Sequence, residues 1–293
     1  MSVSNLNRYL TMGAIEGFAQ YVAPLSAFSF VVKPGASALN DVVRVPFAQN
    51  VSASSVFNYT TGYNVEGNTI VGKSVTMDKL LFQKITLTDS DLSVLNEDAL
   101  SRVGHQAGMQ LAADFMSASF ASVITEANFP TSGSNTSANY SSSAALVALD
   151  KLANDLKWPD GERSIIATSG LWANFLGNTN FNLAYALGDS SVVKQAKIQE
   201  IFGFSPYKVS QVLPNGDTGF AVNPNAILIA NGYHSPEAAG TQYVDAQQLV
   251  LEGTGLTIGF RQFYVPLLAS SFRVFDVLGG AALGNPNALI HIK

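Results

Sequence analysis

The stretch VTMDKLLFQKITLTDSDL, residues 75–92, passes from the periodicity of a strand to the signals that begin a helix. Ile85 and Leu87 alternate with polar residues, which is the pattern of a half-buried strand. The Thr-Asp-Ser that follows offers side-chain oxygens for a helix N-terminus, and Asp89 and Asp91 suit the positive end of the helix dipole. We therefore expect a strand that leads directly into a helix.

The residues before this stretch suggest a long hairpin. Val43, Val45 and Phe47 alternate with less apolar neighbours, so a first strand is expected there, with the Ile85–Leu87 strand as its return. The chain between, residues 49–76, is rich in Ser, Asn, Thr, Tyr and Gly and has few large aliphatic residues. Such a segment builds no core of its own, and long connections of this kind are usually functional.

The residues after this stretch predict the longest helix of the chain, residues 91–126. It would rise about 54 Å at 1.5 Å per residue, and we expect it to span the molecule as a rod. Gly104 and Gly108 weaken this prediction, because a break near them would shorten the helix. The apolar residues repeat in steps of four, so the buried stripe rotates around the helix: Leu92, Leu95, Ala99, Val103, Ala107, Leu111 and Phe115.

Residues 1–42 show no sustained helical or strand period, and Gly13, Gly17, Pro24 and Pro34 interrupt them. We interpret them as an N-terminal arm and not as a domain.

Residues 144–235 show a different sequence pattern, in which short helices and short strands are expected to alternate. Helices are expected at 146–156, 171–176 and 192–201, and buried strands at 164–168 and 226–230. This alternation is typical of an α/β module with a central sheet. In the C-terminal part of the chain, further strands are expected at 249–251, 256–260, 271–278 and 288–292.

The composition excludes several kinds of chemistry. The 293 residues contain no Cys, which rules out disulfides and thiolate sites. His105, His234 and His291 are the three histidines, and none has a second His at helical zinc spacing, so structural or surface roles are expected. The net charge of −5 argues against a basic nucleic-acid surface, and no run of 18 apolar residues predicts a membrane span.

The low charge is the feature that most needs an explanation. Charged residues make up 13% of the chain, against about 25% in an ordinary soluble domain. Either neighbouring copies cover much of the monomer surface, since interfaces are depleted of charge, or the free surface is a neutral one of Ser, Thr and Asn.

The whole order of segments resembles the major capsid proteins of tailed bacteriophages, which have the Hong Kong 97-type fold. Residues 75–92 look like the family's strand entering its spine helix, and KIQEIFGFSPYKVSQVLP (197–214) is similar to its Gly-Phe-x-hydrophobic-Tyr strand ending in Leu-Pro. AILIANG (226–232) resembles the late axial-domain strand. ASSFRVFDVLGGAAL (269–283) resembles the return to the peripheral domain.

The resemblance implies an α+β fold with five segments. They are an N-arm (1–42), an extended β-hairpin loop (43–88), a peripheral domain with the spine helix (89–143), an α/β axial domain (144–240) and return strands to the axial and peripheral domains (241–293).

The resemblance also implies that the chain has a structural role in an assembly and does not catalyse a reaction. Copies would form hexamers and pentamers of an icosahedral shell around double-stranded DNA, held by enclosure, with no enzymatic residue, cofactor, metal or membrane partner. The protein would be made in the host cytoplasm and end in the virion. Since only about 42 residues precede the first strand, either a separate scaffolding protein guides assembly or processing has removed an N-terminal scaffolding segment. Met1 favours the separate protein, and a portal would complete the shell. Contacts between subunits are expected from Phe57, Tyr59, Tyr63, Glu66 and Lys73 on the hairpin and from Arg8 and Tyr9 on the arm.

Two alternatives stay open. The first keeps the fold and makes the chain the shell of an encapsulin-like compartment with protein cargo, for which an N-terminal helix lining the interior would be diagnostic. The second is an α/β hydrolase or a carbohydrate-binding protein, suggested by Trp158, Trp172 and many tyrosines. It predicts a stable monomer with paired carboxylates in a pocket, whereas isolated Trp and Tyr are more often core or interface anchors.

Overall fold

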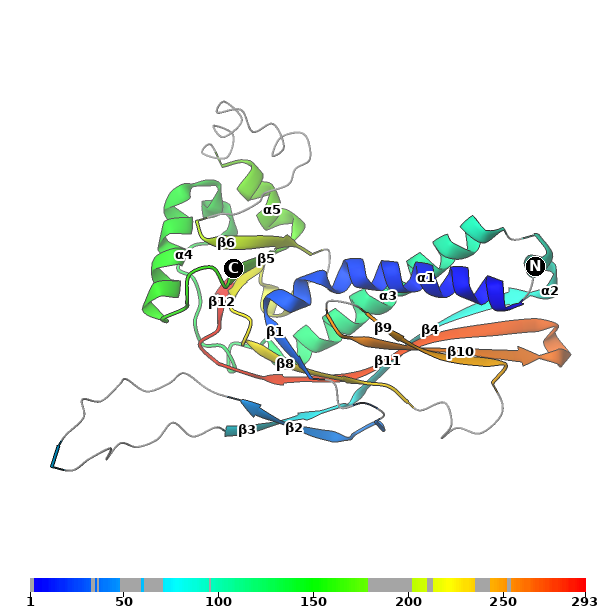
Figure 1. Ribbon diagram of the computed structural model, residues 1–293. Helices are drawn as coiled ribbons and strands as arrows, with labels where there is room; N and C mark the ends of the chain where they lie inside the picture. Colours follow the sequence, from blue (N-terminus) through cyan, green and yellow to red (C-terminus); the bar gives the residue numbers. More distant parts are fainter. Residues whose placement is uncertain are drawn as a thin grey trace.

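The computed structural model of the protein describes residues 3–32, 35, 37–47, 59–60, 71–94, 96–178, 202–209, 213–234, 243–251 and 254–293. Its helices are α1 (Val3–Val22), α2 (Asp89–Val94), α3 (Glu97–Val123), α4 (Ser143–Asp155) and α5 (Ser169–Leu176). Its strands are β1 (Ser29–Val32), β2 (Val42–Phe47), β3 (Val71–Thr76), β4 (Lys79–Thr88), β5 (Arg163–Ala167), β6 (Phe204–Lys208), β7 (Gly219–Val222), β8 (Ile227–Gly232), β9 (Asp245–Val250), β10 (Thr257–Val265), β11 (Ser270–Leu283) and β12 (Leu289–Ile292). Figure 1 shows an elongated body with α1 and α3 on one side of a large sheet and the β2–β3 pair on the other.

The larger sheet has six strands and is built around β11. Its order is β1–β8–β11–β10–β9, and β4 pairs with the other edge of β11. All neighbours are antiparallel except β1 and β8. The strand expected around Ile85 and Leu87 is therefore confirmed as β4, but its expected partner is wrong, because it pairs with β11 and not with β2.

The return strand of the hairpin is β3. It pairs with β2 from Val42 opposite Thr76 to Phe47 opposite Val71. The base of this hairpin lies on the face of the large sheet opposite the helices. There, Val45, Val75 and Met77 are buried in one cluster with residues of β8 and β11. This packing holds the β2–β3 pair against the large sheet.

The interpretation of residues 1–42 as an arm without a helical period is wrong. Val3–Val22 is a helix, α1, whose buried side chains recur at every fourth residue: Leu6, Leu10, Ala14, Phe18 and Val22. Such spacing places them along one face of a helix. After a 3₁₀ turn (Ala23–Ala27), β1 joins the larger sheet beside β8. The N-terminal segment is therefore part of the core.

Glycines allow α1 and α3 to touch through their backbones. A Cβ atom at Gly104 would overlap the carbonyl oxygen of Leu10, and one at Gly108 would overlap that of Ala14. The contact is reciprocal, because a Cβ at Gly13 or Gly17 would overlap carbonyl oxygens of α3. The glycines in the expected rod thus do not break it. They permit the close approach of a second helix.

The predicted 91–126 helix is instead two helices, and the break precedes the glycines. The Asn96 side chain accepts a hydrogen bond from Ala99 N at 2.9 Å, which caps the first turn of α3. Glu97 and Asp98 follow in the first turn, where the helix dipole favours acidic residues. At 1.5 Å per residue, the 27 residues of α3 extend about 40 Å, so α3 still runs along most of the body.

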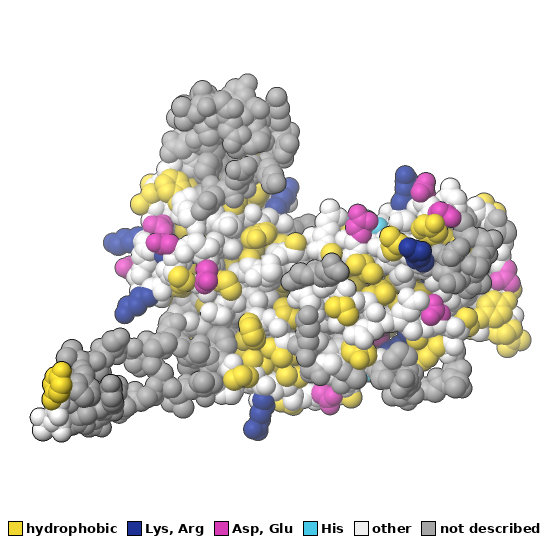
Figure 2. Space-filling model, viewed as in Figure 1, with side chains coloured by type: hydrophobic (Ala, Val, Ile, Leu, Met, Phe, Trp, Pro, Cys, Tyr) yellow, Lys and Arg dark blue, Asp and Glu magenta, His cyan; other side chains and the backbone are white. Residues whose placement is uncertain are grey.

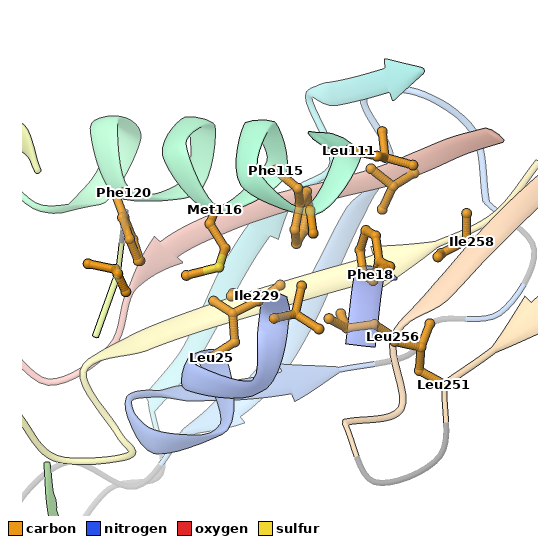
Figure 3. Packing of buried hydrophobic residues seen from close by; sticks show 14 of the residues in the cluster. Phe18, Leu25, Leu111, Phe115, Met116, Phe120, Ile229, Leu251, Leu256 and Ile258 are labelled. Atoms are coloured by element: carbon orange, nitrogen blue, oxygen red, sulfur yellow. The ribbon is translucent and has the colours of Figure 1, made fainter. Parts of the chain in front are cut away.

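The main core lies between these two helices and the larger sheet. Phe115, Met116 and Phe120 of α3 point toward the sheet, where Ile229 and Ile258 meet them (Figure 3). Phe18 of α1 is buried in the same cluster. This continuous apolar layer makes α1, α3 and the sheet one packed unit.

A smaller unit follows α3 and has its own sheet, of order β12–β7–β5–β6. The helices predicted at 146–156 and 171–176 are confirmed as α4 and α5, which pack near this sheet. Both tryptophans are buried in the same cluster. Arg163, at the start of β5, is buried and pairs with Asp150 at 2.6 Å and Asp160 at 2.7 Å. The helix expected at 192–201 lies outside the described residues.

One strand of the expected α/β module belongs elsewhere. β8, predicted at 226–230, pairs with β1 and β11 in the larger sheet, whereas the C-terminal β12 completes the smaller one. The four strands expected near the C-terminus are confirmed as β9 to β12. The longest of them is β11, which pairs with β4, β8 and β10 along its length.

Candidate functional site

The β2–β3 hairpin carries most of the residues expected to contact another subunit. Tyr59 lies in a turn and is 96% exposed. Lys73 pairs with Val45 and so shares the face that packs toward the large sheet, which leaves its side chain half-buried. Phe57, Tyr63 and Glu66 lie outside the described residues. Of the hairpin candidates in the structure, Tyr59 is therefore the one most accessible to a partner.

The two candidates on α1 lie far from the hairpin, at the opposite end of the body (Figure 1). Arg8 is exposed, but Tyr9 is half-buried and its hydroxyl forms a hydrogen bond with Glu97 in the first turn of α3. This hydrogen bond to a carboxylate raises the pKa of Tyr9. Tyr9 thus ties α1 to α3 within one subunit, and the structure does not bring Arg8 and Tyr9 together with Lys73.

Sequence reasoning missed an exposed aromatic region on the outer face of the large sheet, the face opposite α1 and α3. Phe82 of β4 is 64% exposed. Lys84, two residues along the same face, lies over the ring of Phe272 at 3.9 Å from its centroid. Next to Phe272 on β10, Phe263 contacts Tyr243 with ring centroids 4.8 Å apart. We call Phe82, Lys84, Phe263 and Phe272 the outer aromatic face.

A signal for this face is present in the sequence. In β4, the set Leu81, Gln83, Ile85 and Leu87 faces the core, and the alternate set also contains large apolar residues, Leu80 and Phe82. A strand that is apolar on both faces is expected to be covered on both. Since Leu80 and Phe82 remain exposed in one chain, a cover from outside the subunit is favoured.

The histidine at the C-terminal end has a structural environment. His291 and Asp217 are fully buried, and His291 Nδ1 lies 2.5 Å from Asp217 Oδ2. Lys293 Nζ lies 3.0 Å from Asp217 Oδ1 and 2.7 Å from Glu126 Oε1. The cluster joins β12 to the chain that leaves α3. Across the part of the chain that the structure describes, no three His, Asp or Glu side chains gather where they could hold a metal ion.

The Glu126–Lys293 pair makes a prediction about acid stability. A hydrogen bond and the charge of Lys293 lower the pKa of Glu126 from its ordinary 4.5. A carboxyl whose folded pKa is lowered stabilises the fold above its unfolded pKa, and this contribution is lost as the pH falls through the folded pKa. In urea unfolding, Glu126→Gln should therefore be less stable than the parent at pH 6, and the difference should shrink as the pH falls below 4.5 and disappear below the lowered pKa of the folded protein. A difference that stays constant down to pH 3 would contradict this assignment.

A surface depression beside α4 does not match the site of a hydrolase. It has a volume of about 300 Å³ and lies between α4 and residues 132–140. Its lining contains one carboxylate, Asp155, whereas the hydrolase alternative predicts a pair. Trp158 and Trp172 are 7% and 8% exposed, so neither presents a face on which a sugar could stack. No helix in the described residues is long and apolar enough to span a membrane.

Comparison with known proteins finds no matching family model and no matching curated protein. Solved structures do match. A virus-like particle from Pyrococcus furiosus has a TM-score of 0.55 at 15% identity, covering 97% of this chain and 97% of that chain. The capsid of cyanophage P-SCSP1u has a TM-score of 0.53 at 15% identity, covering 90% and 85%. A structure from Mycobacterium phage Che8 has a TM-score of 0.52 at 14% identity, covering 87% and 84%.

These likenesses extend over nearly the whole of each chain, and their identities are too low to carry more than the architecture. They agree with the elements described above: a long helix beside a large sheet, a hairpin that leaves the body, and a smaller α/β unit. The chain has the α+β fold of tailed-phage major capsid proteins, the Hong Kong 97-type fold.

Proposed function

We propose that the chain is the major capsid protein of a tailed phage and that its copies assemble into an icosahedral shell around double-stranded DNA. The observation that carries the proposal is the capsid fold itself, matched over 84% or more of each phage chain compared. The 13% charge content supports it, because surfaces buried between subunits are depleted of charge. Figure 2 shows the charged side chains of the face in view in small groups of both signs near its two ends, with few between them.

The hairpin and the outer aromatic face supply a complementary pair of surfaces for this assembly. Residues 48–70 contain three aromatic residues, Phe57, Tyr59 and Tyr63, and a single charged residue, Glu66. The outer aromatic face offers exposed Phe82 and the exposed cation of Lys84. A hairpin from one copy lying on this face of the next would bury the aromatic rings of both and bring Glu66 toward Lys84.

In this proposal the segments have distinct roles. The large sheet with α1 and α3 forms the peripheral domain, the smaller sheet with α4 and α5 forms the axial domain, and axial domains meet in hexamers and pentamers. The subunit performs no reaction and holds DNA by enclosure, for which a net charge of −5 is suitable because tight phosphate binding is not required. A scaffolding protein and a portal would act during assembly. The protein would be made in the host cytoplasm and reside in the virion.

One observation favours a second candidate. An encapsulin-like compartment was expected to have an N-terminal helix lining its interior, and residues Val3–Val22 do form a helix, α1. A compartment shell would enclose protein instead of DNA, with the same subunit fold.

Mass photometry and negative-stain electron microscopy of the purified protein test the proposal. We expect rings, tubes or closed shells of many copies, and particles isolated from infected cells should protect DNA from nuclease. Particles that contain protein cargo and no protected DNA would favour the compartment. Monomers under all salt and scaffold conditions would contradict both shell functions.

A further inference from the structure

A buried carboxylate lies on the outer side of the large sheet, next to the outer aromatic face. Asp276 of β11 pairs with Phe82 of β4 on one side and with Gly259 of β10 on the other. Its side chain is 9% exposed, although the neighbouring Phe82 is 64% exposed. A Cβ atom at Gly259 would overlap Asp276 Oδ1. Glycine at this position therefore leaves the space that the carboxylate occupies.

One oxygen of this carboxylate is paired and the other is not. Oδ2 of Asp276 lies 3.2 Å from the guanidinium of Arg261, whose side chain is 18% exposed. Oδ1 is buried and has no hydrogen-bond partner among the described residues. A buried, ionised carboxylate with an unpaired oxygen is costly, and protonation removes part of this cost. The arrangement therefore favours uptake of a proton when the pH falls.

Several charged groups lie around Asp276 on this side of the sheet. Burial is the largest effect on the carboxyl and raises the pKa of Asp276 from its ordinary 3.8, while the charges of Arg261 and His234 lower it. The other surrounding elements contribute Lys84 of β4, Lys73 of β3, the uncharged Gln248 of β9, and Asp78, which pairs with Lys79 at 2.9 Å. The charges that act on Asp276 are thus positive, and Arg261 is the one in direct contact.

Arg261 connects this carboxylate with the outer aromatic face. Its guanidinium carbon lies 5.6 Å from the ring centroid of Tyr243, and Tyr243 contacts Phe263 of that face. While Asp276 is ionised, its charge balances that of Arg261, and the face offers a partner the cation of Lys84. When Asp276 is protonated, the positive charge of Arg261 is no longer balanced.

We propose that Asp276 masks the charge of Arg261 and that acidification removes this mask, which strengthens the binding of an acidic segment of a neighbouring copy to the outer aromatic face. The inference rests on the proposed function, in which that segment is the hairpin. Residues 48–70 carry a single charge, that of Glu66. Removal of the mask adds a second cation beside Lys84, so the protonation of one buried carboxyl regulates a surface used in assembly.

The pH dependence of stability tests the titration of Asp276 on the single subunit. An aspartate whose folded pKa is raised destabilises the fold while it is ionised, above that pKa, and no longer does so below its unfolded pKa, which is ordinarily 3.8. Asp276→Asn is neutral at every pH. In urea unfolding, the parent should therefore gain stability relative to Asp276→Asn as the pH falls from 7 to 4. A difference that does not change with pH would overturn the inference.

The protein concentration at which particles begin to form measures the effect of the mask on assembly. At pH 7, this threshold should be about tenfold lower for Asp276→Asn than for the parent, since one charge-assisted contact is added per interface. The parent should approach the variant as the pH falls. Addition of Arg261→Gln to Asp276→Asn should cancel the gain, because no cation is then released.

Asp98→Asn is the matched control. Asp98 is exposed in the first turn of α3, on the other side of the large sheet, so loss of this charge should leave the threshold unchanged. The same threshold for Asp276→Asn and the parent would overturn the inference, and so would a gain that persists in the double variant. Absence of particles from the parent and all variants at every pH would instead contradict the shell function. The stability measurement on the single subunit distinguishes the two failures.

Discussion

Replacing Gly108 by alanine is expected to lower the free energy of unfolding by about 1–3 kcal/mol, the usual cost of overpacking. The added Cβ would overlap the carbonyl oxygen of Ala14 in α1, which is backbone and cannot rotate away. In an ordinary helix the same change would be favourable by up to about 1 kcal/mol, because alanine is the better helix former. The clash must therefore outweigh this gain by displacing α1 from α3. Urea unfolding followed by circular dichroism measures the difference.

Gly170→Ala is the matched control for this substitution. Gly170 also lies in a helix, α5, and no heavy atom approaches within 4 Å of the place where its Cβ would be. The control should leave stability unchanged or raise it by up to about 1 kcal/mol. If Gly108→Ala were as stable as Gly170→Ala, the two helix backbones would not be in contact, and the account of the main core would be wrong.

Replacing residues 48–70 by Asn-Gly is expected to abolish assembly and leave the subunit folded. The last pair of the β2–β3 ladder is Phe47 opposite Val71, and a two-residue Asn-Gly turn closes an antiparallel pair with the required twist. The buried anchor of Val45, Val75 and Met77 is retained, so the melting temperature should change little. The variant loses the aromatic residues proposed to cover the neighbour, so particle formation should fall below detection by electron microscopy.

A variant with residues 48–70 in scrambled order is the control for chain length and composition. It should fold and also fail to assemble, because the positions of Phe57, Tyr59 and Tyr63 are changed. Assembly of the shortened protein at the parental level would exclude a role of the hairpin between subunits. Loss of folding in the shortened protein would instead place residues 48–70 in the core of the subunit.

The helix α1 shows why part of the fold could not be predicted from local signals. Its buried residues follow a regular spacing, but Gly13 and Gly17 interrupt the pattern and count as helix breakers in isolation. In the folded chain these same glycines are required, because α3 lies against them. The property that selects glycine is a tertiary contact, and a one-dimensional pattern does not contain it.

The strands illustrate the same limit in another form. Period-2 alternation located β2 and β4, and short continuous apolar runs located β5 and β8, yet neither signal states which strand pairs with which. β4 pairs with β11, nearly two hundred positions later, and β8 joins the larger sheet. The split of the long helix before α3 was readable, since Asn96 followed by two acidic residues is an N-cap signature, but the continuous apolar series obscured it.

The candidate site could be predicted only in part. Aromatic residues in a polar segment pointed to the hairpin, and Tyr59 is exposed as a contact residue requires. Tyr9 was predicted to contact another subunit, but its hydroxyl forms a hydrogen bond with Glu97 of the same chain. The outer aromatic face was missed, because exposure depends on which strands cover one another and not on residue type alone.

Cryo-electron microscopy of the assembled particle tests the central claim most directly. The account predicts that residues 48–70 of each subunit lie across the outer aromatic face of a neighbour and bury Phe82, which is 64% exposed in the single chain. A map in which this segment folds back on its own subunit, while Phe82 stays open to solvent in every copy, would contradict it.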